Sequence, residues 1–485
     1  MAHVANTHEN PPLLSTLPAR LDALPWSRWH TRVVAALGIT WMLDGLEVTV
    51  VGSIGPVLQR SETLGLSAAQ IGWAGSAYVG GAVLGALFFG RLADRLGRKP
   101  LFLATLSVYL VATLLTALTF DFRTFVLCRL LTGFGIGGEY AAINSAIDEL
   151  IPARVRGFVD LAINGSFWIG AAAGAALSIV LLEPGRFGPD VGWRLAFAFG
   201  SALTIAILIV RRHLPESPRW LLTRGRVAEA ETIVRAIEEE VVRDRGPLPP
   251  PASSFALRVR GHVSWSEILR LMVSRYRRRA TLSFVLMATQ AFFYNAIFFT
   301  YALVLTTFYG VADAEVGYYI FPFAVGNFLG PLLLGRWFDT LGRRIMLTAT
   351  YALAGIGLLA TGYAFTQGWL DARTQTLCWS AIFFFASAAA SAAYLTVSEI
   401  FPLEMRAVAI SIFYALGTGV GGFLGPALFG ALIDAGDRGD LFAAYASAAV
   451  AMCAAAVVAA LIGVDAERKP LEAVARPLSA HDEPV

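Results

Sequence analysis

The sequence predicts an all-α polytopic membrane protein in which twelve transmembrane helices form two pseudo-symmetric halves of six. Hydrophobic residues make up 56% of the 485 residues and charged residues only 15%, which is far more apolar than a typical soluble chain. The apolar residues form continuous runs of roughly 20 residues or more, enough for a helix to cross a hydrocarbon core of ~30 Å. A β-barrel would instead show alternating segments of ~10 residues.

The charged segments between the apolar runs divide the chain into parts. Twelve runs cover residues 33–58, 68–90, 100–120, 124–147, 158–182, 194–212, 281–308, 315–335, 345–366, 374–398, 408–433 and 440–464. A polar insert with fifteen arginines between residues 211 and 279 separates the first six runs from the last six. We therefore expect an N-terminal segment (1–32), a first half (33–212), a linker of short amphipathic helices (213–279), a second half (280–464) and a C-terminal tail (465–485).

The arginine-rich loops predict the orientation. RLADRLGRK after the second run, PARVRG after the fourth, the insert, and GRR after the eighth all fall on one side. Because lysine and arginine favour the cytoplasmic side, we expect the N-terminal segment, the linker and the tail in the cytoplasm. The expected location is a bacterial plasma (inner) membrane.

An internal repeat indicates that the two halves are duplicates. GRLADRLGRK at 90–99 returns as GRWFDTLGRR at 335–344, and ELIPARVRG at 149–157 returns as EIFPLEMRA at 399–407. Duplicated six-helix halves are typical of transporters that bind a solute between the halves, near the membrane midplane.

These motifs resemble those of the major facilitator superfamily over residues 30–465. PESPRW at 215–220 and the Glu-x-x-Pro-x-x-x-Arg loops are similar to the sugar-porter branch and its organic-ion and synaptic-vesicle-glycoprotein relatives. DGLE at 44–47 resembles a motif in the first span of niacin and aromatic-acid proton symporters. The resemblance implies the major facilitator fold and a secondary transporter.

Three departures from the sugar-porter pattern argue against a hexose as the first choice of substrate. The seventh run has TQAFFYN in place of Gln-Gln-x-x-Gly-x-Asn, and SAAY places Tyr394 at a tryptophan position. Asn164 stands where sugar porters carry a glutamine. The fifth run also lacks the Gly-x-x-x-Gly-Pro signature of drug antiporters.

Four charged residues within the spans are candidates for proton coupling: Asp44, Glu47, Arg129 and Glu139. Asp44 and Glu47 are three residues apart and share a helical face. A carboxylate in a dry site holds a proton more readily than one in water, because desolvation disfavours its charged form. A purely structural ion pair is the alternative, and Glu47 is the better match to the family motif. The resemblance also implies that Arg129 neighbours the acid of the first span.

Amide and aromatic side chains near the midplane are candidates for binding the solute. Amides and phenols orient polar groups, whereas aromatic rings form walls for an apolar part. The candidates are Asn164, Trp168, Gln290, Tyr294, Asn295 and Tyr394. Aromatic stripes that serve only for helix packing are the alternative.

The duplicated loops also predict a cytoplasmic gate. Acid–base clusters at equivalent places in two halves can form bridges that close one side and break when the site opens to it. The predicted gate residues are Asp94, Arg98, Glu149, Arg156, Asp339, Arg343, Glu399 and Arg406. Alternatively, the arginines only set topology and the acids are their solvated partners.

The sequence thus favours a proton-coupled importer of a small organic solute, such as an organic or aromatic acid, that works by alternating access. A sugar or polyol carrier, an organic cation or drug exporter, and a non-transporting membrane receptor remain alternatives. An enzyme, a cofactor, a metal site and a nucleic-acid partner are not expected, since no catalytic or ligand spacing occurs. The expected partners are a small-molecule substrate and the lipid bilayer, and the expected state is a monomer.

Overall fold

The expected twelve apolar helices are present in the computed structural model. The structure describes residues 13–182, 186–188, 190–211, 214–250, 255–257, 264–298, 300–312, 315–422, 428–429, 432–433 and 436–478. Within them, twelve stretches of helix are long and apolar enough to cross a membrane, which confirms the predicted number.

The first half begins earlier than the apolar run suggests, because α2 starts at Arg28. Its helices are α2 (Arg28–Leu58), α3 (Ala68–Leu96), α4 (Arg98–Ala117), α5 (Phe122–Leu150), α6 (Arg156–Gly165), α7 (Phe167–Leu181) and α8 (Val191–Arg211). Polar caps set several starts: Ser67 Oγ accepts the Gln70 amide at the start of α3, and Asp121 accepts two amides at the start of α5.

The second half contains α12 (Arg277–Phe298), α13 (Tyr301–Tyr309), α14 (Val316–Thr340), α15 (Arg343–Thr366), α16 (Ala372–Ile400), the 3₁₀ turn η2 (Leu403–Met405), α17 (Arg406–Gly417), the π-turn η3 (Thr418–Gly422) and α19 (Arg438–Ile462). The expected eleventh span runs to residue 433, so part of it lies outside the described residues.

Two expected spans are not single helices. The fifth breaks at Ser166, between α6 and α7, and the seventh breaks before Thr300, between α12 and α13. At the first break the Ser166 hydroxyl donates to the Gly38 carbonyl of α2, at 2.9 Å, in addition to a carbonyl of its own chain turn. This contact between distant helices is a tertiary feature that hydropathy does not report.

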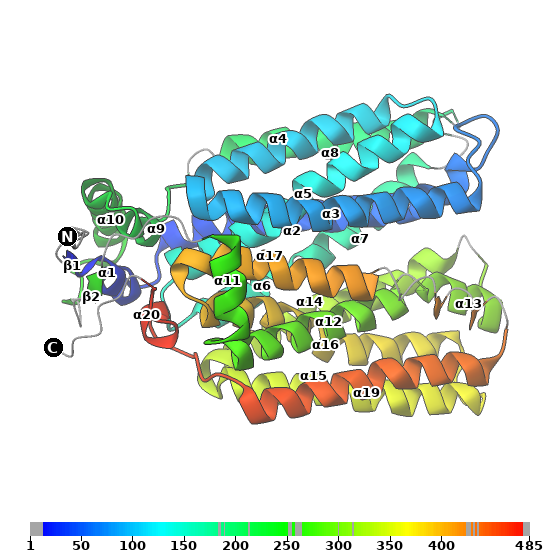
Figure 1. Cartoon of the computed structure of the whole chain (residues 1–485). Helices are drawn as coiled ribbons and strands as arrows, with labels where there is room; N and C mark the ends of the chain where they lie inside the picture. The colour runs from blue at the N-terminus through cyan, green and yellow to red at the C-terminus, as the bar shows by residue number, and fades with distance from the viewer. Residues whose placement is uncertain are drawn as a thin grey trace, which may run out of the picture.

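The two halves lie side by side along the long axis of the molecule (Figure 1). Helix α6 of the first half packs on α14 of the second, and α17 of the second packs on α3 of the first. The halves therefore meet through these two helices, which start at equivalent positions of the sequence repeat.

Glycines bring helices of the same half into backbone contact. A Cβ at Gly133 or Gly137 of α5 would lie 2.0 Å from a carbonyl oxygen of α3, and a Cβ at Gly81 or Gly85 of α3 would lie 2.0 Å from a carbonyl oxygen of α5. Small residues four apart permit this approach, as in other membrane helix pairs. The glycine-rich run of α5 thus serves packing, as the sequence predicts.

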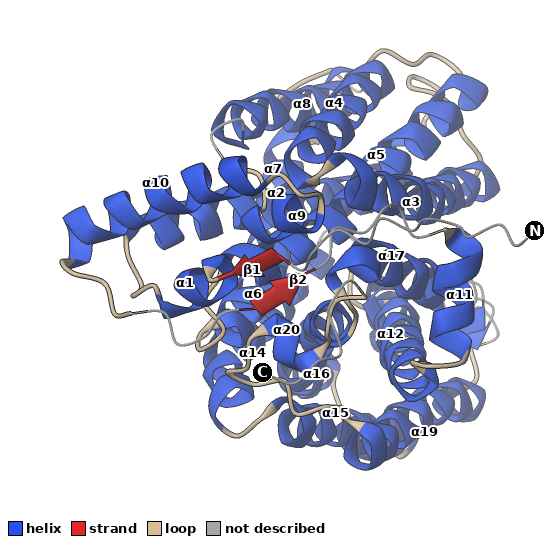
Figure 2. Ribbon diagram, turned by 60° about the vertical axis from the view of Figure 1, so that its left-hand side comes forward, coloured by secondary structure: helices blue, strands red, loops and turns tan. Residues whose placement is uncertain are grey.

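Both termini and the insert lie at one end of the bundle, which we call the basic end (Figures 1 and 2). The elements there are β1 (Leu13–Ser15), α1 (Leu17–Ala23), α9 (Pro218–Thr223), α10 (Val227–Arg245), β2 (Phe255–Leu257), α11 (Trp265–Val273) and α20 (Leu471–Val474). β1 pairs antiparallel with β2, with Leu13 opposite Leu257. At 19 residues, α10 is longer than the short helices expected of the linker.

Candidate functional site

Helix α2 carries the two acids of the first span into the interior because it packs closely on α7. A Cβ at Gly45 would lie 1.9 Å from the Phe167 carbonyl oxygen, and a Cβ at Gly170 would lie 1.8 Å from that of Met42. The side chains of Asp44 and Glu47, on either side of Gly45, are 2% and 3% exposed. Both carboxylates are therefore held away from solvent and need partners within the protein.

Glu47 pairs with Arg129 of α5. Arg129 Nη1 lies 2.5 Å from Glu47 Oε1, and the guanidinium lies over the Tyr78 ring of α3, 4.6 Å from its centre. Both charges are almost fully buried, so removing either one would leave the other without compensation. The neighbour expected for Arg129 from the family resemblance is thus in contact with it.

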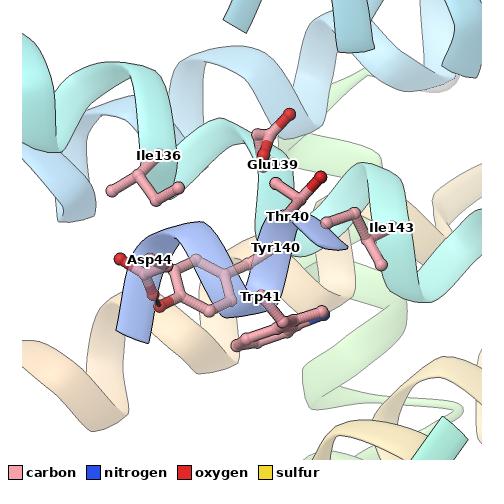
Figure 3. A pocket seen from close by; sticks show the side chains of 7 residues that line it. All are labelled: Thr40, Trp41, Asp44, Ile136, Glu139, Tyr140 and Ile143. Carbon is pink, nitrogen blue, oxygen red and sulfur yellow. Dashed lines mark hydrogen bonds between the residues drawn. The ribbon is translucent and has the colours of Figure 1, made fainter. Parts of the chain in front are cut away.

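Asp44 instead lies between two tyrosine hydroxyls. Tyr78 donates to Oδ1 at 2.9 Å, and Tyr140 of α5 donates to Oδ2 at 2.5 Å. Asp44 also lines a space of about 10 Å³, close to what one water molecule needs (Figure 3). Among the described residues, no ion pair joins Asp44 to a cation.

Glu139, the third acid, belongs to a different contact. It neighbours Tyr140 in the sequence, but its carboxylate points away from Asp44 (Figure 3) and accepts from the Thr105 hydroxyl of α4 at 3.5 Å. The first half thus buries three acids within two helices, and one arginine neutralises only the second of them directly.

A larger cavity of about 140 Å³ lies between the halves. Its walls come from α2, α5, α6, α7, α12 and α16, so both halves contribute. The lining residues are Trp41, Tyr140, Asn164, Phe167, Trp168, Gln290, Tyr294, Ser387, Ala390, Ser391 and Tyr394. Five of the six predicted binding residues are among them, and none of these described lining residues is charged.

The remaining candidate, Asn295, is not among the lining residues. Its Nδ2 donates to the Ala291 carbonyl of its own helix at 2.6 Å. Tyr301, expected on the same face as Gln290, lies beyond the helix break and donates to Thr376 at 3.0 Å. Placing these residues on one continuous helix was wrong, because α12 ends at Phe298.

Two amides of the cavity wall keep hydrogen-bonding capacity. Asn164 donates through Nδ2 to Asp160, at 3.2 Å, but its Oδ1 has no partner among the described residues. No protein hydrogen bond of the Gln290 side chain occurs among the described residues, whereas the Tyr294 hydroxyl is already bonded to Asn327 at 2.8 Å. Asn164 and Gln290 can therefore offer a ligand both an acceptor and a donor.

At the basic end, the predicted gate residues of the first half reach α17 of the second. Arg98 lies 2.7 Å from Glu149 and 3.5 Å from Asp94. Asp94 Oδ2 accepts the Val408 amide in the first turn of α17, at 3.2 Å. From the second half, Arg406 approaches Glu149 at 3.7 Å.

The second half repeats this arrangement with the roles exchanged. Arg343 lies 3.0 Å from Glu399 and 2.9 Å from Asp339. Asp339 accepts the Gly157 amide in the first turn of α6, at 3.0 Å. From the first half, Arg156 approaches Glu399 at 3.6 Å.

All eight predicted gate residues are thus brought together and buried, each at most 4% exposed. Each half supplies an aspartate at the positive N-terminal end of a helix of the other half, where a carboxylate is stabilised. These contacts join the two halves at the basic end. The burial excludes the alternative in which the acids are merely solvated partners of the arginines.

The N-terminal helix adds a further connection at this end. The Asp22 carboxylate of α1 accepts Arg219 of the PESPRW motif at 2.9 Å and lies 3.4 Å from Arg156, while Arg219 also contacts Glu472 of α20. Burial alone would raise the pKa of the Asp22 carboxyl, but the Arg219 and Arg156 guanidinium groups outweigh burial and hold this pKa below its ordinary value.

Sequence reasoning missed several residues of these clusters. Trp41, Tyr78 and Tyr140 read as ordinary aromatic residues of apolar spans, and only the packing of α2 on α3 and α5 identifies them. Asp148 and Asp160 flank the PARVRG motif and are 0% exposed. Two acids so close to a predicted gate were a signal available in the sequence.

Comparisons with known proteins agree with this architecture. The profile of the family described as sugar (and other) transporter matches residues 34–465. The niacin transporter NiaP of Acinetobacter baylyi is 27% identical over 460 residues, which cover 94% of this chain and 99% of NiaP. The putative metabolite transport protein YyaJ of Bacillus subtilis is 29% identical over 423 residues, 85% of this chain and 87% of YyaJ.

A solved structure shares the fold. The proton:xylose symporter XylE bound to 6-bromo-6-deoxy-D-glucose superposes with a TM-score of 0.73, over 92% of this chain and 98% of XylE, at 19% sequence identity. At this identity the likeness concerns the fold alone.

Proposed function

The chain belongs to the sugar (and other) transporter family of the major facilitator superfamily, and from this premise we propose that it is a proton-coupled importer of a small aromatic or heteroaromatic acid. Membership makes it a multi-pass membrane transporter. The substrate class and the proton coupling are the proposal, and they rest on the geometry of the two neighbouring cavities.

The observation that carries the proposal is the position of Tyr140. Its hydroxyl donates to Asp44 at 2.5 Å, and the residue lines the central cavity as well as the small space beside Asp44. A solute that displaces the Tyr140 ring would therefore change the hydrogen bonding of a buried carboxylate. This is a direct physical route by which substrate binding and proton binding influence each other.

The cavity walls favour a flat ring. Six of the lining residues are aromatic, and the volume of about 140 Å³ resembles the ~150 Å³ apolar cavity that holds one benzene molecule. Asn164 and Gln290 supply the acceptor and donor that a carboxylic acid group needs. The relative named a niacin transporter carries a single-ring pyridine carboxylic acid of this description.

The absence of a charged group among the described lining residues explains why a proton is needed. A carboxylate in this cavity would be buried without a counter-ion, which is costly. A proton bound at Asp44, at Glu47 or on the substrate compensates that charge. We assign the proton to Asp44, because Glu47 is held by Arg129 at 2.5 Å.

We further propose that the basic end forms the closed gate of an alternating-access cycle. The Arg156–Glu399 and Arg406–Glu149 contacts, and the two aspartates that accept amides of the opposite half, separate when the cavity opens to that end. We place this end in the cytoplasm of a bacterium and the protein in its inner membrane as a monomer. A reporter fused to the C-terminus tests the orientation.

Flux measurements in proteoliposomes test the proposal. With an inwardly directed proton gradient, labelled nicotinate or benzoate should accumulate above its outside concentration, and a protonophore should abolish the accumulation. Asp44→Asn should lose accumulation but keep exchange of labelled for unlabelled substrate. Glu139→Gln, which also neutralises a buried acid of this half, is the matched control and should keep both activities.

Flux that ignores the gradient would leave a uniporter and refute the coupling. A defect in Glu139→Gln equal to that of Asp44→Asn would refute the assignment of the proton. Binding without any flux would indicate a receptor on a transporter fold.

A sugar carrier is the second candidate, favoured by the four uncharged hydrogen-bonding side chains Asn164, Gln290, Ser387 and Ser391. Competition decides between the two: xylose or glucose in excess should leave nicotinate uptake unchanged if the aromatic proposal holds. An organic cation fits less well, because the described cavity wall offers it no carboxylate.

A further inference from the structure

Helix α11 occupies an unusual position at the basic end. It runs across the long helices on the outside of the bundle, next to α12 (Figures 1 and 2). Ile268 and Met272 face the protein and are 0% and 4% exposed. α11 ends at Val273 and the span of α12 begins at Arg277, so α11 lies at the depth where that span starts.

A second apolar face of α11 is uncovered. Trp265, Leu269 and Val273 follow one another at four-residue spacing and are 36%, 48% and 77% exposed. This stripe adjoins the buried face and is bordered by the exposed Arg270, so apolar residues occupy about half of the helix circumference. Trp is typical of the membrane–water boundary, and such a stripe is typical of helices that lie in the plane of that boundary.

Arginines follow the stripe directly. Arg275, Arg277 and Arg278 are exposed, and within the described residues none of them forms an ion pair with a carboxylate. Other arginines at this end behave differently: Arg20 pairs with Glu231 and Glu238, and Arg219 pairs with Asp22 and Glu472.

The start of α12 also favours an anion. The helix opens with three consecutive arginines, and its first turn holds no acidic residue. Positive side chains at the positive end of a helix dipole repel it, whereas an anion bound there is attracted by both the arginines and the dipole. Arg279 is already occupied, since it donates to the Ile400 and Val474 carbonyls at 2.6 and 2.9 Å.

We propose that α11 and residues 274–278 form a binding site for an anionic phospholipid of the surrounding membrane. The phosphate binds Arg275, Arg277 and Arg278, and the acyl chains cover Trp265, Leu269 and Val273. A soluble phosphate would leave the apolar stripe bare, and arginines that only set topology would need no stripe beside them. The site is separate from the central cavity and does not depend on which solute is carried.

Lipid binding to the full-length protein tests the proposal. After delipidation in a neutral detergent, native mass spectrometry compares phosphatidylglycerol with phosphatidylcholine of the same acyl chains. We expect at least tenfold tighter binding of phosphatidylglycerol. The triple variant R275Q/R277Q/R278Q should bind both lipids equally, and L269Q/V273Q should also bind phosphatidylglycerol more weakly than the wild type.

Two further variants guard against trivial explanations. R275K/R277K/R278K keeps the charge and should retain the preference, which separates lost binding from lost folding. R226Q/R235Q/R243Q removes three exposed arginines in and next to α10, each bonded to a glutamate side chain or carbonyl, and should bind like the wild type.

Equal binding of the two lipids by the wild type would overturn the proposal, as would an unchanged R275Q/R277Q/R278Q variant. Displacement of phosphatidylglycerol by millimolar inorganic phosphate would indicate a free-anion site instead. An equal loss in the α10 control would indicate a general effect of net charge, which also refutes the site.

Discussion

Breaking the buried Arg129–Glu47 pair should destabilise the protein strongly, and more so when the arginine is removed. At 2.5 Å and an effective dielectric constant of ~20, the attraction of two unit charges is roughly 6–7 kcal/mol, part of which offsets their desolvation. Loss of one partner of such a pair costs about 3–5 kcal/mol. Arg129→Gln should fall at the upper end, since it leaves two buried acids on one face of α2 without a cation.

A double-mutant cycle measures the interaction. The unfolding free energies of Arg129→Gln, Glu47→Gln and the double variant, determined by chemical denaturation in micelles, should be non-additive by about 2–3 kcal/mol. Because the double variant carries no unpaired charge, it should be more stable than Arg129→Gln. Arg226→Gln is the control, since its pair with Glu229 is about half exposed and is worth roughly 0–1 kcal/mol.

Additive losses would refute this reasoning, because they would mean that the two side chains do not interact in the folded protein. A double variant less stable than Arg129→Gln would refute it as well, since the cost would then lie in packing rather than in uncompensated charge.

Three other predictions concern single contacts. Tyr140→Phe removes a hydrogen bond to a carboxylate worth about 1.5–3 kcal/mol, so gradient-driven accumulation should fall about tenfold or more in the proteoliposome assay, while Tyr445→Phe should not change it. Gly137→Ala places a Cβ 2.0 Å from the Ala82 carbonyl oxygen and should cost about 1–3 kcal/mol of stability by pushing α3 and α5 apart, whereas Gly75→Ala, with open space around it, should cost less than half as much. Because the pKa of Asp22 is lowered, the docking of α1 should be complete above about pH 4 and be lost only as the pH falls through that lowered pKa. Hydrogen exchange of residues 17–23 should show protection at pH 7, which Asp22→Asn abolishes; equal protection in both proteins would contradict the role of Asp22.

Hydropathy was sufficient for the number and approximate ends of the spans, because a helix is the structure that satisfies its own backbone in lipid. The repeat identified all eight residues of the basic-end network, since duplicated loops return to equivalent places. The breaks at Ser166 and before Thr300 were not predictable, because both lie within runs that remain apolar in sequence.

For the candidate site, the sequence by itself determined which charges are buried: Asp44, Glu47, Arg129 and Glu139 stand in apolar runs whatever their neighbours. Only the tertiary structure decided their partners. Glycine contacts set how closely α2, α3, α5 and α7 approach, and that spacing gives Glu47 the arginine and Asp44 the hydroxyls of Tyr78 and Tyr140. Burial follows from one helix, whereas pairing depends on the distance between helices, which a single-helix pattern does not contain.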